Sequence, residues 1–252
     1  MIILIVSLFF ISHIFLLNYY KEVWWDSAVY IGMGKYAYSN GNSGIWEESR
    51  PIVWPLMLGF FWKVGLNPIF IGRILEIAFG SLCILLTYLI GKKLFNEKIA
   101  LLASIFLALS PIFFFSNGIM LTEIVSVFFA LAAIYSLISK KHFISGVLFG
   151  IAFMTRFLQL FAFVSLVLVY LIYNKQNVKN FKKIIIGFAI TLFPYLILNF
   201  ILYNNPIYPF TYQILLTQNS GWFAYQPFSF YFMQLFNENI LYLLGFAGMF
   251  LM

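Results

Sequence analysis

Two acidic side chains and two arginines stand out in a chain that carries few charges. Asp26 is the only aspartate of the sequence, and Glu123 stands at the start of a long apolar run. Arg50 and Arg156 are two of its three arginines. A carboxylate can take a proton from an attacking hydroxyl, and a guanidinium offers a fixed fork of N–H donors that suits phosphate. With aromatic rings nearby, these residue types suit an anionic lipid headgroup that carries a sugar.

Each of these four residues also has an ordinary structural explanation. An aspartate can cap the free N–H groups at a helix start, so Asp26 could open the helix expected over 27–38. The helix dipole favours an acid near the N-terminus, which would explain Glu123. Arg50 could anchor the chain among lipid headgroups. Arg156 interrupts an apolar stretch, where an ionisable residue indicates either function or a structural ion pair.

Aromatic residues supply further candidates for substrate contact. Segment 204–238 is rich in Tyr, Phe and Trp, as is typical of an aromatic belt at a membrane surface. The same rings could form a lid that stacks on a sugar, with Trp222 and Tyr225 as candidates. Tyr30 is a third candidate, although its helical spacing with apolar neighbours also fits a face turned to lipid or to the core.

The sequence offers little for a metal centre. Cys83 is the only cysteine, and His13 and His142 stand in separate segments, so neither residue type forms a metal site. A divalent cation that bridges Asp26 and Glu123 is an alternative, but two carboxylates without an outer histidine make a sparse site.

The composition is that of a membrane protein. Of 252 residues, 63% are hydrophobic and 9% are charged, with a mean hydropathy of +0.95. Soluble domains carry roughly 25% charged residues. Several continuous apolar runs approach or exceed the roughly 18 residues that span a hydrocarbon core. The net charge of +7 comes mostly from lysines in short loops, so it reflects membrane topology and no nucleic-acid partner is expected.

We expect an all-α polytopic bundle of about seven or eight transmembrane helices. The expected spans lie at about 2–19, 73–91, 98–115, 120–138, 143–155, 157–173 and 184–203, and an eighth, incomplete apolar helix covers 239–252. The run 51–65 contains two prolines and is expected to lie in the interface within an external loop 21–72. Arg73 and Glu76 stand three residues apart, so we expect them to pair.

The lysines predict the orientation of the chain. Cytoplasmic loops carry an excess of Lys, and lysines cluster at 91–98, 139–143 and 174–183. We therefore expect a cytoplasmic N-terminus, with loops 21–72 and 204–238 external. Three lysines of the first loop run against this rule: Lys21, Lys35 and Lys63. All three arginines fall on the external side, which favours an external site.

The order of the segments resembles a known superfamily. A first span precedes "WDSAVYIGMGKYAYSNG" and then "RPIVWPLMLGFFWKVG", and "SNGIMLTEIVSVFF" and "SGVLFGIAFMTRFLQLFAFV" follow. This ordered set, over residues 1–203, is similar to the seven-span module of the GT-C superfamily of membrane glycosyltransferases. The similar branch includes the protein O-mannosyltransferases and the lipid A aminoarabinose transferases. The segments 204–238 and 239–252 lie beyond this module.

The resemblance implies an external active site and a polyprenyl-phosphate-linked sugar as donor, with a glycan, lipid or protein acceptor that the sequence does not identify. It implies that Asp26 is the catalytic acid of the first loop and that Glu123 is a second acidic position. It implies donor-phosphate contacts for Arg50 and Arg156. Many members have a second acid directly after the first, whereas this chain has Ser27.

The leading hypothesis is therefore a glycosyltransferase of the plasma membrane, with Asp26 as general base on an acceptor hydroxyl that attacks C1 of the sugar with inversion. One alternative is a non-catalytic or degenerate relative, because of the departure at Ser27. Another is a lipid or small-molecule transporter. Transporters commonly show repeats and charges at the midplane, and we find no internal repeat in the sequence.

Overall fold

The computed structural model describes residues 1–17, 19, 22–173 and 178–219, with residues 227, 229, 230 and 233. Every regular element within them is a helix, as predicted. The helices are α1 (Ile2–Leu16), α2 (Trp25–Tyr38), α3 (Val53–Lys63), α4 (Pro68–Leu94), α5 (Glu97–Leu109), α6 (Pro111–Ser116), α7 (Thr122–Ile138), α8 (His142–Thr155), α9 (Gln159–Tyr173), α10 (Val178–Tyr203) and α11 (Tyr208–Asn219).

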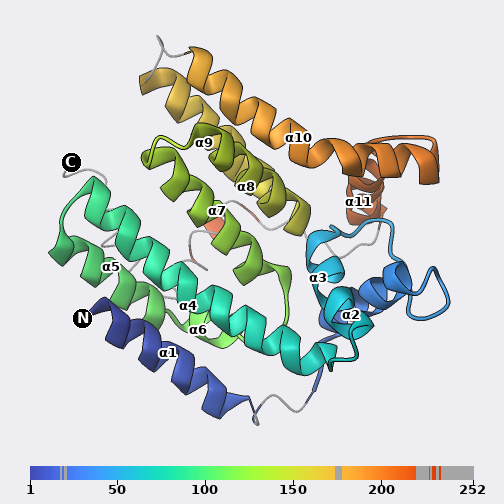
Figure 1. Cartoon of the computed structure of the whole chain (residues 1–252), viewed down its shortest axis with the longest axis horizontal. Coiled ribbons are helices and arrows are strands. Elements are labelled where there is room, and N and C mark those ends of the chain that lie inside the picture. Colours follow the sequence, from blue (N-terminus) through green and yellow to red (C-terminus); the bar gives the residue numbers. More distant parts are fainter. Residues whose placement is uncertain are drawn as a thin grey trace.

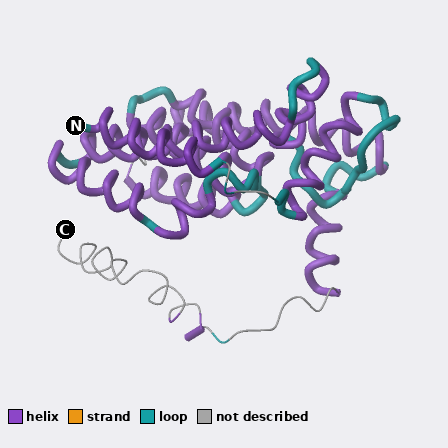
Figure 2. Tube along the Cα trace, turned by 90° about the horizontal axis from the view of Figure 1, so that it is seen from below, coloured by secondary structure: helices purple, strands orange, loops and turns teal. Residues whose placement is uncertain are grey.

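Two of these helices, α4 and α10, are long and apolar enough to cross a membrane. The apolar helices α1, α7, α8 and α9 are shorter. These helices are consistent with a helical membrane protein, while the number of spans stays a prediction. Helices α7 and α8 lie between α4 and α10, and the short helices α2 and α3 gather at one end of the bundle (Figure 1). At right angles to that view, α11 projects away from the layer of helices (Figure 2).

Local sequence signals set several helix starts. The side chain of Asn67 accepts hydrogen bonds from the backbone N–H groups of Ile69 and Phe70, and Pro68 occupies the first turn of α4. Proline suits this position because its fixed φ matches the helix and no N–H is lost. The side chain of Asn96 caps α5 in the same way. As a result α4 begins before the predicted span at 73–91; it also continues past the end of that span, to Leu94.

The short helices α2 and α3 cross where both carry a glycine. A Cβ atom added to Gly34 would meet the backbone of Pro55 and Gly59, so no larger residue fits at this crossing. Tyr30 lies one turn before Gly34 on the same helix. The close crossing therefore holds the start of α2, with its polar side chains, next to the chain that leads into α3.

A buried core lies beneath this crossing and joins α2 and α3 to the start of α7. Its members are Tyr30, Ile31, Trp54, Leu58, Met120 and Val125. The helix expected at 27–38 is thus present as α2, beginning two residues earlier, and α3 is a separate short helix within the run 51–65. Helix α11 lies within the segment predicted as an aromatic loop, and the predicted helix at 239–252 lies outside the described residues.

Candidate active site

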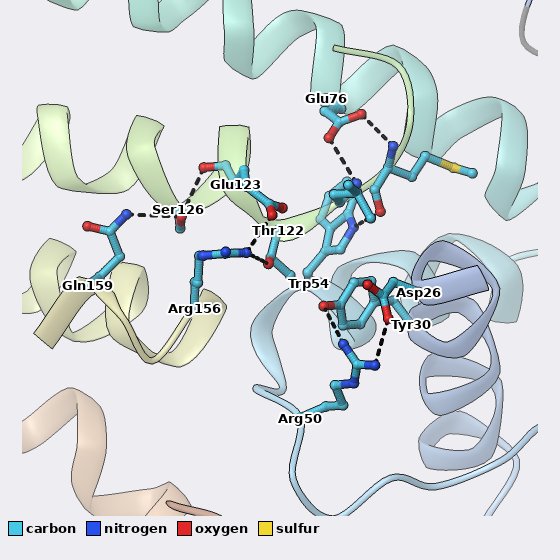
Figure 3. Close-up of polar contacts among 12 residues, drawn as sticks. Asp26, Tyr30, Arg50, Trp54, Glu76, Thr122, Glu123, Ser126, Arg156 and Gln159 are labelled. Atoms are coloured by element: carbon cyan, nitrogen blue, oxygen red, sulfur yellow. Dashed lines mark hydrogen bonds and ion pairs between the residues drawn. The ribbon is translucent and has the colours of Figure 1, made fainter. Parts of the chain in front are cut away.

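Asp26 and Arg50 form the first ion pair of the candidate site. Asp26 stands in the first turn of α2, and its Oδ1 accepts from Nη2 of Arg50 at 2.6 Å. The same guanidinium donates from Nε to Oε2 of Glu47 at 2.8 Å and from Nη1 to the hydroxyl of Tyr30 at 3.3 Å. Figure 3 shows Arg50 directed at Asp26 and Tyr30. Three different nitrogens of one guanidinium are therefore engaged.

Two aromatic rings flank this guanidinium. The Cζ atom of Arg50 lies 5.6 Å from the ring centroid of Trp25 and 5.5 Å from that of Tyr30. A cation within about 6 Å of a ring is attracted by the negative face of the π system. The side chain is 21% exposed, so the rings and the carboxylates hold Arg50 in place without closing it off from solvent.

Glu123 and Arg156 form the second ion pair. Glu123 lies in the first turn of α7, and its Oε1 accepts from Nη1 of Arg156 at 2.7 Å. Arg156 follows directly after α8 and also donates to Oγ1 of Thr122 at 3.2 Å. The second oxygen of Glu123 is buried and has no hydrogen-bond partner among the described residues. The predicted break between two short helices near Arg156 is thus present.

Tyr30 is a buried partner of the first pair. Its ring is buried, with 5% exposure. Burial raises the pKa of its hydroxyl above the ordinary value, while the charge of Arg50 and a hydrogen bond from the side chain of Thr122 act to lower it. The hydroxyl is therefore protonated at neutral pH. Hydrogen bonds and ion pairs thus join Asp26, Arg50 and Tyr30 on one side and Thr122, Arg156 and Glu123 on the other.

A buried carboxylate fixes the loop that precedes α7. Glu76 of α4 is fully buried, and its Oε2 accepts from the backbone N–H groups of Gly118 and Met120 at 2.8 and 2.6 Å. Its Oε1 accepts from the N–H of Leu121 at 3.0 Å. Met120 has a φ of +68°, which is uncommon for a residue with a side chain. Glu76 thus stabilises a strained loop next to Glu123.

Residues of α2 and α3 also bind this loop. The indole N–H of Trp54 donates to the carbonyl oxygen of Met120 at 3.0 Å, and Oγ of Ser27 donates to that of Ile119 at 2.6 Å. Helices α2, α3 and α4 therefore all hold one loop, and Figure 3 shows Trp54 between Glu76 and Tyr30. This arrangement sets the position of Thr122 relative to Asp26.

Two expectations from the sequence are wrong. Glu76 does not pair with Arg73, because its oxygens accept hydrogen bonds from the backbone of the loop. Nη2 of Arg73 instead donates to the carbonyl oxygen of Glu22 at 3.1 Å. Asp26 does not cap α2 either. The cap residue is Trp24, which makes no side-chain cap bond, and Asp26 lies inside the first turn and faces Arg50.

Some polar residues of the site were not candidates from the sequence. Glu47 binds Arg50 from three positions earlier, a spacing that could have suggested it. Gln159 donates from Nε2 to Oγ of Ser126 at 3.1 Å and so ties α9 to α7. No sequence signal marks this pair, because both residues are common on helix surfaces and the contact depends on how the helices pack.

Aromatic residues connect the first loop to α10 and α11. The indole N–H of Trp46 donates to the hydroxyl of Tyr203 at 2.7 Å, and the ring of Tyr203 stacks on that of Tyr208 with centroids 4.7 Å apart. The start of the aromatic segment therefore lies against the first loop. The two lid candidates, Trp222 and Tyr225, lie outside the described residues.

The donor set suits a phosphate better than a cation. Asp26 and Glu123 each face a guanidinium at 2.6 and 2.7 Å. A divalent cation bridging them would have to displace both arginines. Across the part of the chain that the structure describes, no three His, Cys, Asp or Glu side chains are grouped to hold a metal.

One comparison with known proteins gives a match. A family model described as dolichyl-phosphate-mannose-protein mannosyltransferase matches residues 49–203, more than half of the chain. The matched region includes Arg50, Glu123 and Arg156, and it begins after Asp26. No curated protein and no solved structure matches the chain.

Proposed function

Because the chain belongs to the family of dolichyl-phosphate-mannose-protein mannosyltransferases, we propose that it moves a sugar from a polyprenyl-phosphate-linked donor to an acceptor hydroxyl at the external face of the plasma membrane. Family membership makes it a membrane glycosyltransferase of the mannosyltransferase type. One observation carries the finer proposal: two carboxylate–arginine pairs lie at one end of the bundle, where Arg50 also donates to Tyr30 and Arg156 also donates to Thr122.

The arginines would bind the donor phosphate. A lipid phosphate leaves as an anion, so it needs charge stabilisation more than it needs a proton. Arg50 and Arg156 each hold a carboxylate in the free protein, and a bound phosphate would take over part of their N–H groups. The protonated hydroxyl of Tyr30, next to Arg50, could donate to the same phosphate. The prenyl chain would lie in the membrane beside the apolar helices.

Asp26 would act as the general base. The acceptor oxygen attacks C1 of the sugar, the acceptor proton passes to the carboxylate of Asp26, and the bond between C1 and the phosphate oxygen breaks with inversion. Phosphate binding would draw Arg50 away from Oδ1 of Asp26 and leave that oxygen free to take the proton. General-base help of this kind contributes roughly 10²–10⁴-fold in rate. Glu123 would keep Arg156 oriented through their ion pair while Arg156 binds the phosphate.

The test is sugar release and transfer from a synthetic polyprenyl-phosphate mannose by the purified protein. We expect turnover by the unchanged protein and by Glu97→Gln, a control at the first residue of α5. We expect a strong loss in Asp26→Asn. A protein that binds the donor but never releases sugar from it would be a non-catalytic relative, and a protein that moves the donor across a vesicle membrane without cleaving it would be a transporter.

A further inference from the structure

A shallow basic pocket lies at the end of α8 that is remote from Arg156. It has a volume of about 450 Å³ and is lined by Lys140, Lys141, His142, Phe143, Ile144 and Lys183. Helix α8 has 14 residues, so roughly 20 Å separates this basic pocket from the candidate active site at 1.5 Å per residue. In Figure 1 the turn between α7 and α8 and the start of α10 lie at the same end of the bundle.

The chain provides no acid to neutralise the pocket lysines from the helices around it. Between Glu123 and Glu238 the sequence contains no Asp or Glu, so α8, α9 and α10 carry none. Among the ion pairs of the described residues, none includes a pocket lysine. Lys92, in contrast, has Glu97 as a partner at 3.6 Å. The positive charge of the basic pocket is thus available to a ligand.

The start of α8 adds backbone donors to these charges. No side chain caps the helix, whose cap position is Lys141. The first N–H groups of a helix lack partners within it and favour an anion. The turn itself is held by backbone bonds from Lys140 to the carbonyl of Leu137 and from Lys141 to that of Ser136. The donors and the lysines are therefore presented on an ordered turn.

Close packing fixes the other wall of the pocket. A Cβ atom on Gly146 would meet the backbone of Ile184, and one on Gly187 would meet the carbonyl of Phe143. Such contacts between small residues let two helix backbones touch, and they hold Lys183 beside the start of α8. Burial lowers the pKa of His142, a backbone hydrogen bond at Lys140 acts to raise it, and the charge of Lys183 lowers it further.

We propose that the basic pocket binds the phosphate group of an anionic phospholipid, at the membrane face opposite to the candidate active site. Basic pockets between helices at a membrane surface are suited to anionic headgroups. Phe143 and Ile144 are 43% and 46% exposed beside the lysines, where acyl chains would cover them. A free phosphate would meet the same charges but would leave these two side chains uncovered, which favours the lipid.

The experiment compares two variants that lose equal charge. Lys140→Gln with Lys183→Gln removes two pocket lysines, and the control, Lys63→Gln with Lys98→Gln, removes two exposed lysines elsewhere. The full chain is titrated in neutral detergent with phosphatidylglycerol, phosphatidylcholine or inorganic phosphate, with Tm and retained lipid by native mass spectrometry as readouts. We expect phosphatidylglycerol alone to raise Tm, and the pocket variant to bind it about 25-fold more weakly, roughly fivefold for each lysine.

Three results would overturn the proposal. Unchanged phosphatidylglycerol binding in the pocket variant would mean that the lipid does not bind at the basic pocket. An equal loss of phosphatidylglycerol binding in the control variant would mean that net charge, and not the pocket, determines binding. The same rise in Tm with inorganic phosphate would make the site one for a soluble anion. If the double variant does not fold, Lys183→Gln alone gives the same test. Its retained phosphatidylglycerol is measured by native mass spectrometry, and we expect its affinity to fall about fivefold.

Discussion

Arg50 has a chemical role that lysine can replace only in part. Its guanidinium uses separate nitrogens for Asp26, Glu47 and Tyr30, whereas a lysine offers a point charge. Charge-assisted hydrogen bonds are worth about 1.5–3 kcal/mol, which is roughly 10- to 150-fold in affinity. We expect Arg50→Ala to weaken donor binding by such a factor and Arg50→Lys to weaken it less. Equal donor Kd values for Arg50→Ala and the unchanged protein would leave Arg50 as an interfacial anchor.

Asp26→Asn should separate chemistry from stability. The substitution keeps the size of the side chain and removes its basicity, so transfer should fall by at least about 10²-fold. Asp26 is 34% exposed in its pair with Arg50, and pairs open to solvent contribute about 0–1 kcal/mol, so Tm should change little. Donor binding, transfer and Tm are measured together. An active Asp26→Asn would make Glu123 the leading base, with Glu123→Gln as the next variant.

Tyr30→Phe should test the contact between Tyr30 and Arg50. The ring would still fill its place in the core, but the hydrogen bond that the hydroxyl accepts from Arg50 would be lost. One hydrogen bond is worth about 0.5–1.5 kcal/mol, so kcat/KM should fall roughly threefold to tenfold. Burial raises the pKa of Tyr30 above its ordinary value of 10.0, so the ratio between the two proteins should stay constant from about pH 6 to about pH 9. A ratio that varies within that range would point to another titrating group.

Charged residues can be found in a sequence more easily than their partners. The four residues chosen for their chemistry do lie in two ion pairs at one end of the bundle, yet nothing in their spacing relates Asp26 to Arg50. Glu76 illustrates the difficulty. Its spacing from Arg73 predicted a local pair, but a fully buried carboxylate needs several donors, and these come from N–H groups 42 to 45 residues later in the chain. Only the packing of α4 against that loop creates the contact.

The loop before α7 should be the most sensitive element near the site. Glu76→Ala would leave two buried N–H groups and one partly buried N–H group without acceptors, and each buried group costs about 1–3 kcal/mol. We expect a loss of stability of at least about 2 kcal/mol, together with reduced transfer because Glu123 follows the loop directly. Denaturation and activity assays measure both effects.

Glu97→Gln serves as the control for the loop variant, since it removes an exposed carboxylate remote from the loop. It should match the unchanged protein in both assays. A Glu76→Ala protein with full stability would mean that water replaces the carboxylate in the loop.

The sequence predicts helix positions well where an apolar run ends abruptly in a polar turn. The expected helices at 120–138 and 143–155 agree with α7 and α8 within a few residues, since lysines and a polar turn separate two apolar runs. Helix α11 was expected as loop, because aromatic residues and prolines are frequent in membrane-surface loops. Its rings pack against the end of α10, and this tertiary contact favours a helix that the local sequence does not predict.

The whole molecule has two chemically different ends. Carboxylate–arginine pairs lie at one end, and the lysine-rich basic pocket lies at the other. The positive-inside rule then predicts that Lys92, Lys140 and Lys179 are cytoplasmic and that Asn42 and Asn219 are external. Single cysteines at these sites should react with an impermeant reagent from outside whole cells only at Asn42 and Asn219. Labelling at Lys179 but not at Asn219 would reverse the orientation and place the active site in the cytoplasm.

The short helices beside the site have a consequence for the surrounding bilayer. Helices α8 and α9 have 14 and 15 residues, which correspond to roughly 21–23 Å at 1.5 Å per residue. A hydrocarbon core is about 30 Å thick, and a hydrophobic stretch shorter than the core is accommodated by local thinning. Lipid next to these helices would therefore be compressed wherever they cross the bilayer. A prenyl phosphate in the thinned region would sit closer to the bilayer midplane than its neighbours do, level with the ends of α7 and α8 that carry Glu123 and Arg156.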